Sequence, residues 1–138
     1  MTGLTIRQPW AWAILHAGKR IENRSWRCKY RGPLLIHAAK GMTKMEYDLA
    51  AAFIHRASGI YCPPSRALER GGFVGICKVV DCVSEGSSAS FDPWFCGPWG
   101  IVLDEVRSIP FEAAAGSLGL FTVQPELAAI LVSSGAVS

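Results

Sequence analysis

The chain has 138 residues, of which half are hydrophobic and 18% charged, and its formal net charge is +3. This length and composition predict a single globular domain over residues 1–138 and exclude an intrinsically disordered chain. No uncharged apolar run reaches the roughly 18–20 residues of a membrane-spanning helix, so no membrane partner is expected. The small net charge also argues against a nucleic-acid coat protein that binds without regard to sequence.

The first 60 residues carry signals for three strands and two helices. In chain order these are a strand at Leu4–Ile6, a helix at Trp10–Ala17, strands at Lys19–Arg24 and Pro33–Ala38, and a helix from Thr43 to Ser58. Pro9 stands where the first helix starts, and Gly18 ends that helix.

The second helix has the clearest start signal in the chain. Thr43 and Glu46 form a T-x-x-E capping box, and Gly59 ends the helix. The expected buried stripe of this helix consists of Met45, Leu49, Ala52 and Phe53.

The remaining residues predict more of a sheet and one short helix. After a loop at Ile60–Glu69, the expected elements are strands at Gly72–Val83, Trp99–Leu103 with Val106–Ile109, and Gly119–Val123, and a helix at Glu126–Leu131. Five to six short strands of mixed spacing, flanked by two to three helices, predict an α+β fold built on a small, partly closed β-barrel.

Charge is distributed unevenly along the chain. The first 40 residues hold eight of the 14 basic residues and one acid, Glu22, which gives this segment about +7. Three of the five tryptophans lie in the same segment. Cations beside aromatic rings suit a ligand that has both phosphate and base, so a nucleoside, a nucleotide or single-stranded RNA is the expected partner. A solvated basic edge without a ligand is the alternative.

The sequence predicts neither a metal nor a cofactor. The histidines show no metal-ligand spacing, and no glycine-rich phosphate loop is present. The five cysteines are odd in number, widely spaced and without a CxxC pair, which favours free thiols in a reducing cytoplasm. The N-terminus lacks the apolar core of a signal peptide, and a monomer is the expected state.

The segment Gly18–Arg24 holds the strongest catalytic candidates. Residues two apart in a strand share a face, so Arg20, Glu22 and Arg24 are expected to point the same way. Lys19 lies at the helix-to-strand turn and can also reach a cleft. A lysine held among cations can serve as a base, and Glu22 can orient or activate water. The alternative is a structural network in which Glu22 holds Arg20 and Arg24 at the barrel mouth.

Several sequence blocks, in a specific order, resemble the ASCH domain family. They are QPWA at 8–11, GKxxExR at 18–24, YRGxxxIHA at 30–38, the strand at 72–82, and GPWGIVL at 97–103. The resemblance implies a barrel similar to the PUA domain, with a cleft beside the first helix that binds RNA or nucleobase-like ligands. It also implies one of three activities: hydrolysis of the amide of N4-acylated cytidines, nuclease activity, or binding alone.

One position departs from the amidohydrolase members of that family. Lys19 matches their basic lysine, but Glu22 stands where their nucleophilic threonine would be. Ser25 should face the other side of the strand. A covalent mechanism with a hydroxyl nucleophile therefore lacks its nucleophile. Attack by a water molecule that Glu22 activates is the route that remains. The amidohydrolase members also use an acidic residue later in the chain. Glu85 and Asp92 are the nearby candidates for that residue here, and neither lies in a matching motif.

The remaining expected site residues come from the aromatic and basic blocks. The predicted substrate-binding residues are Gln8, Pro9, Trp10, Arg24, Trp26, Arg31, His37, Lys40, Trp94 and Trp99. Trp10 and Trp12 leave the helix roughly 200° apart, so at most one of them lines the cleft. His37 follows an apolar strand, where a buried and hydrogen-bonded histidine is the commoner arrangement.

Three functional hypotheses follow from the sequence. The first is a module that binds a base or RNA, with Arg24, Arg31 and Lys40 on phosphates. The second is a small hydrolase of N4-acylcytidine type, or a ribonuclease, that uses Lys19 and Glu22 in the same cleft. The third is an adaptor whose basic face docks an acidic protein.

Overall fold

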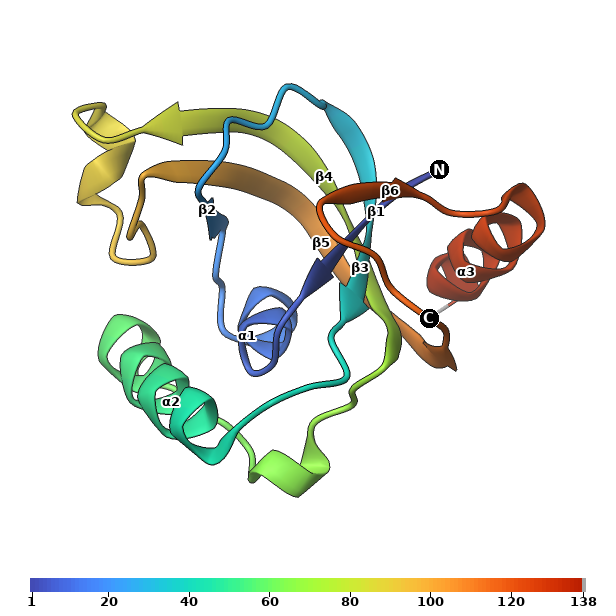
Figure 1. Cartoon of the computed structure of the whole chain (residues 1–138), viewed down its shortest axis with the longest axis horizontal. Helices are drawn as coiled ribbons and strands as arrows, with labels where there is room; N and C mark the ends of the chain where they lie inside the picture. The colour runs from blue at the N-terminus through green and yellow to red at the C-terminus, as the bar shows by residue number, and fades with distance from the viewer. Residues whose placement is uncertain (138) are drawn as a thin grey trace.

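The computed structural model of the chain describes residues 1–137, which form one six-stranded mixed sheet with three helices (Figure 1). The strands are β1 (Thr2–Ile6), β2 (Ile21–Arg24), β3 (Gly32–Ala38), β4 (Gly72–Ser84), β5 (Trp99–Ala113) and β6 (Leu120–Thr122). Their order in the sheet is β2-β5-β4-β3-β1-β6. The pair β1 and β3 is parallel, and the other neighbours are antiparallel.

The sheet curls into a half-barrel because its two longest strands bend together. The register between β4 and β5 shifts at three places, and such bulges increase strand twist and bend the sheet. Leu34, Ile36, Val79, Ile101 and Leu103 fill the interior of the curved sheet. The predicted α+β half-barrel is confirmed.

Three helices flank the sheet near the places where the sequence expects them, and the third extends beyond its predicted end at Leu131. They are α1 (Trp10–His16), α2 (Lys44–Ser58) and α3 (Pro125–Val137), and short 3₁₀ turns occur at Ser65–Ala67 and Ser88–Phe91. In Figure 1, α2 and the loop between β4 and β5 lie on the left, and α3 lies on the right. The capping box of Thr43 and Glu46 is present, and Gly59 ends α2 with a left-handed backbone at φ 76°.

The predicted buried stripe of α2 is wrong at three of its four residues, and the fourth, Phe53, is partly buried against the cluster around Ile54. Met45 and Leu49 are exposed, and the buried residues are Ala50 and Ile54. Ile54 packs with Trp94 and the α1 residue Ala13, so contacts with distant segments decide which face of α2 is covered.

The largest differences from the predicted strands occur at β2 and β5, and the other strands differ by one or two residues at their ends. The second strand begins at Ile21 instead of Lys19, so Arg20 lies outside it. Arg20 is exposed and pairs with Asp104 at 3.1 Å, and does not share the face of Glu22. The two segments expected at 99–103 and 106–109 form one continuous strand, β5, in which Glu105 adopts a positive φ of 50°.

No helix in the described part of the chain is both long and apolar enough to cross a membrane.

Candidate functional site

Lys19 enters the barrel mouth because of the turn that follows α1. Gly18 adopts a left-handed backbone at φ 76°, a conformation that costs glycine little. The next N–H, that of Lys19, then donates to Ala13 O at 3.2 Å. The turn places the Lys19 side chain in the interior, where only 3% of it is exposed.

Lys19, Glu22 and Arg24 form one buried ionic network. Lys19 Nζ donates to Glu22 Oε1 at 2.9 Å and to Ile21 O at 2.6 Å. The second carboxylate oxygen, Glu22 Oε2, accepts from Arg24 Nε at 3.1 Å. A carboxylate with a cation on each oxygen satisfies the condition under which a buried charge is tolerated.

Arg24 also joins two strands that are not neighbours in the sheet. Its Nη2 donates to Thr5 O of β1 at 2.8 Å, while β2 and β1 stand four places apart in the strand order. The network therefore connects β2 with β1 across the curved sheet. This gives Glu22 and Arg24 a structural role in addition to any chemical one.

A cavity of about 210 Å³ opens above this network. Its walls come from α1, β2, α2 and the loop before β5; the lining residues are Trp10, Lys19, Glu22, Asn23, Phe53, Trp94 and Cys96. The rings of Trp10 and Phe53 meet edge to face with centroids 5.5 Å apart, and Lys19 Nζ lies 5.6 Å from the Trp10 ring centroid. The cavity thus combines aromatic walls with a charged, buried floor.

Asn23 holds the loop that covers the cavity. Its Nδ2 donates to Trp94 O at 2.9 Å, and its Oδ1 accepts from Cys96 N at 2.7 Å and from Gly97 N at 3.1 Å. Three hydrogen bonds to the loop backbone from one side chain fix the position of Trp94. Trp94 is 5% exposed, so it forms a fixed wall of the cavity.

The family profile of the ASCH domain matches residues 4–110. The chain belongs to the ASCH domain family. ASCH domains have a PUA-like fold, and RNA binding is the activity generally associated with the family. No curated protein gives a significant match to the sequence.

A solved structure is also similar in fold. The crystal structure of a point mutant of the ZmASCH protein from Zymomonas mobilis aligns with a TM-score of 0.55 and 12% sequence identity. The alignment covers 96% of each chain. At this identity the likeness shows the fold alone.

Of the predicted residues, the structure brings Trp10, Lys19, Glu22 and Trp94 together in the cavity. Trp12 lies on a different side of α1, where it packs with His16 at a ring-centroid distance of 5.7 Å.

Two further predicted residues position α1. Gln8 is buried, with its Oε1 accepting from Trp12 N at 2.9 Å and its Nε2 donating to Glu69 O at 2.8 Å. Pro9, which is also buried, follows a cis peptide bond at the helix start.

The other predicted binding residues lie away from the cavity. Trp26 packs against the barrel core, and Arg27 lies over the ring of Trp99. Arg31 donates to Cys28 O and Tyr30 O.

His37 and Lys40 line a separate hollow of about 720 Å³. His37 is buried and hydrogen-bonded through both ring nitrogens, to Thr5 Oγ1 at 3.3 Å and Ala114 O at 2.7 Å. This is the buried, hydrogen-bonded arrangement that the sequence favours for His37.

The candidate later acids and the candidate hydroxyl also lie outside the cavity. Asp92 Oδ1 accepts from Trp94 N at 2.8 Å and shapes the loop, and both Glu85 and Ser25 are exposed. Within residues 1–137, no three His, Cys, Asp or Glu side chains are grouped so that they could hold a metal ion.

Sequence reasoning missed three cavity residues: Asn23, Phe53 and Cys96. Asn23 lies between Glu22 and Arg24, where strand alternation predicts the opposite face. Phe53 was expected in a helix core, and Cys96 lies in a loop without a recognisable motif. No local signal marks these positions, because the cavity is assembled from segments far apart in the chain.

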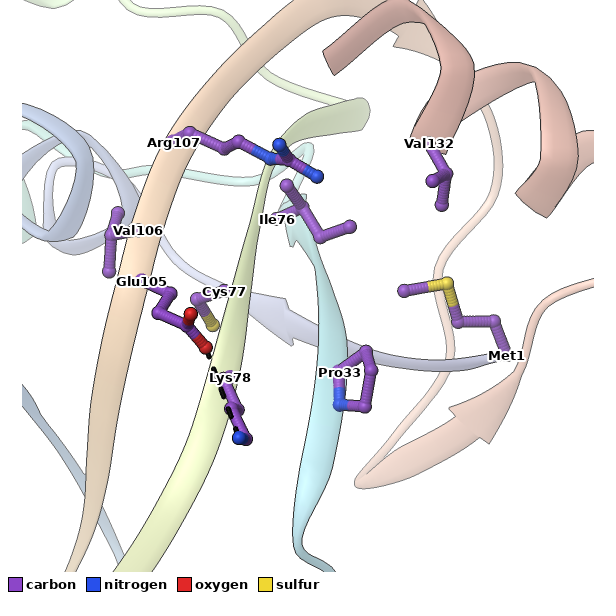
Figure 2. A pocket seen from close by; sticks show the side chains of 9 residues that line it. All are labelled: Met1, Pro33, Ile76, Cys77, Lys78, Glu105, Val106, Arg107 and Val132. Atoms are coloured by element: carbon purple, nitrogen blue, oxygen red, sulfur yellow. Dashed lines mark ion pairs between the residues drawn. The ribbon is translucent and has the colours of Figure 1, made fainter. Parts of the chain in front are cut away.

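A larger hollow of about 680 Å³ lies between β4, β5 and α3 (Figure 2). Met1 and Val132 form one flank, and Ile76 lies on the other. Its charged lining residues are exposed, and Lys78 and Glu105 approach each other only to 4.0 Å. A ligand site usually shows a few convergent polar groups inside an apolar pocket, and this arrangement is found in the cavity over Lys19.

Proposed function

We propose that the cavity over Lys19 and Glu22 binds one nucleobase, presented by a nucleoside or by single-stranded RNA. The observation that carries the proposal is the pairing of aromatic walls with a buried polar floor in a space of about 210 Å³. Typical pockets for drug-sized ligands measure roughly 300–1,000 Å³, so this space suits a single ring system.

The contacts offered by the cavity match those that a base needs. Trp10, Phe53 and Trp94 line the cavity with aromatic rings, and stacking on aromatic rings contributes about 1–3 kcal/mol per base. Lys19 supplies a donor next to an acceptor on Glu22, 2.9 Å away. The edge of a base likewise carries a donor beside an acceptor, so the two edges are complementary.

Amide hydrolysis of N4-acylcytidine is the second candidate, and it rests on the hydrogen bonds of Lys19. An ammonium group has three N–H donors, of which Ile21 O and Glu22 accept two in the described structure. The third can stabilise the oxyanion formed when water attacks the amide carbon. Glu22 retains lone pairs that can take the proton of that water, and the amine of cytidine leaves after receiving a proton.

Binding and product analysis test the two candidates together. Cytidine, N4-acetylcytidine and a short single-stranded RNA are titrated by calorimetry, and each mixture is then separated by chromatography. We expect binding of cytidine to weaken several-fold in Phe53→Leu through lost stacking. Arg20→Met is the matched control for Lys19→Met, because it removes a neighbouring cation that lies outside the cavity.

The outcomes separate the functional classes. Release of cytidine from N4-acetylcytidine supports the hydrolase, whereas shortened RNA supports the ribonuclease. Binding without turnover leaves a binding module. If no ligand binds to the wild-type protein, the base-binding proposal is wrong and the adaptor hypothesis takes its place. The five free cysteines support a reducing compartment such as the cytoplasm as the setting of this activity.

A further inference from the structure

A second, more open groove of about 430 Å³ adjoins the base cavity. Three residues, Trp10, Phe53 and Cys96, line both spaces. The remaining lining residues of the groove are Arg7, Gln8, Glu46, Leu49, Ala50 and Arg56. The two spaces are therefore neighbours, and one ligand could place its ring in the cavity and a second group in the groove.

The charged residues that line the groove differ in whether they have an ion-pair partner. Arg7 binds Glu46 through two hydrogen bonds, Nε to Oε2 at 2.5 Å and Nη2 to Oε1 at 2.8 Å. Glu46 also accepts from Thr43 N in the capping box of α2. The hydrogen bond from Arg7 lowers the pKa of Glu46 to about 2, so this pair remains charged and mutually neutralised.

Arg56 is the cation of the groove that has no acidic partner among the described residues. It lies in the last turn of α2, is exposed, and its guanidinium carbon stands 5.8 Å from the centroid of the Phe53 ring. Phe53 is the wall shared with the base cavity. A free guanidinium is thus held beside that wall, on the groove side.

We infer that the groove is a phosphate subsite, in which Arg56 binds the phosphate of a nucleotide whose base occupies the cavity. The inference rests on the proposed base binding and adds the substrate class: a phosphorylated nucleotide or an RNA strand, in preference to a free nucleoside. The planar guanidinium can donate two parallel hydrogen bonds to a phosphate. Glu46 does not oppose this because Arg7 compensates its charge.

The test compares ligands with and without phosphate. Calorimetric titrations at low salt use cytidine, cytidine 5′-monophosphate, cytidine 3′-monophosphate and a short oligocytidylate. The proteins are wild type, Arg56→Gln and Arg66→Gln. Arg66 is the matched control, since it is an exposed arginine without an ion pair in the described structure and lines a different hollow.

We expect one of the monophosphates to bind about fivefold more tightly than cytidine, the upper range for an exposed ion pair. Arg56→Gln should remove this advantage, so that this variant binds the monophosphate no more tightly than cytidine, whereas Arg66→Gln should retain it. The advantage should also decrease as salt is added. An oligocytidylate that binds more tightly than either monophosphate identifies an RNA strand as the ligand, and equal affinity identifies a mononucleotide.

Three results would overturn the inference. Equal affinities for cytidine and both monophosphates exclude a phosphate subsite while base binding stands. Equal losses in Arg56→Gln and Arg66→Gln show general attraction by positive charge instead of a site. Failure of every ligand to bind overturns this inference together with the proposed function.

Discussion

The base cavity and the hollow beneath α3 differ in what their polar groups do. The hollow is about three times larger by volume, at about 680 Å³ against about 210 Å³, but its charged residues are exposed to solvent. In the cavity, Lys19 and Glu22 are buried and hydrogen-bonded to each other. Buried charges cost folding free energy unless they are paired, so they mark the place where a polar ligand can be recognised. Convergence of polar groups distinguishes the candidate site, and volume does not.

The largest expected effect is on turnover at the cavity. If N4-acetylcytidine is hydrolysed, Lys19→Met should lower kcat about 10²- to 10³-fold, the usual loss when a stabilising donor for the oxyanion is removed. Lys78→Met at the hollow removes an exposed lysine and should leave kcat unchanged. Steady-state kinetics with both variants measure the contrast. Equal kcat values for Lys19→Met and wild type would place the chemistry elsewhere.

The next effect concerns stability, and Glu22 is the residue to change. Glu22→Gln removes the anion between two cations, one of them almost fully buried, and should cost about 3–5 kcal/mol of unfolding free energy. Lys19→Met should cost less, because Arg24 still pairs with Glu22. Glu105→Gln at the hollow should change stability by less than about 0.5 kcal/mol, as expected of an exposed position.

Urea unfolding of the three variants measures these differences. A result in which Glu22→Gln and Glu105→Gln unfold at the same urea concentration would show that the buried network does not stabilise the fold. Because Glu22→Gln is expected to lose more stability than Lys19→Met, a loss of activity in Glu22→Gln must be compared with its loss of stability. Lys19→Met therefore gives the cleaner test of the chemistry.

Cysteine labelling offers a comparison of the two spaces without mutation of the charged residues. Cys96 is exposed at the cavity, whereas Cys77 at the hollow is buried, and burial raises the pKa of its thiol to about 12. At about pH 8, iodoacetamide should therefore label Cys96 well before Cys77, because the thiolate is the reactive form.

Ligand protection extends this experiment. Saturating cytidine, or the tighter monophosphate, should slow the labelling of Cys96, as followed by mass spectrometry of peptides. Cys96→Ser provides the background control. Labelling of Cys96 at the same rate with and without a bound ligand would show that the ligand binds outside the cavity and its groove.

The smallest effect is the pH dependence of the exposed pair in the groove. Glu46 has a pKa of about 2 in the folded chain, below the roughly 4.3 of an unpaired glutamate, so pairing with Arg7 stabilises the fold most above about pH 5. This stabilisation should disappear as the pH falls toward 2. Thermal unfolding of wild type and Glu46→Gln should therefore show a difference near neutral pH that narrows in acid. A difference in stability that stays constant over this pH range would contradict the lowered pKa of Glu46.

Local signals in the sequence determined the elements and the catalytic candidates. The capping box of Thr43 and Glu46 and the left-handed Gly59 placed the ends of α2, since each depends on neighbours within one helical turn. The family motifs around Lys19 and Glu22 likewise lie within short segments, and the structure places both residues in one cavity.

Tertiary structure alone decided which distant groups meet these residues. Phe53 and Trp94 reach the cavity from segments more than 30 residues beyond Glu22, and Arg24 turns to Thr5 of β1. The buried face of α2 follows Ile54 rather than the predicted stripe, because Trp94 and α1 cover that face. Such contacts depend on how the sheet curls, and periodicity within a single segment carries no information about the partner that will cover it.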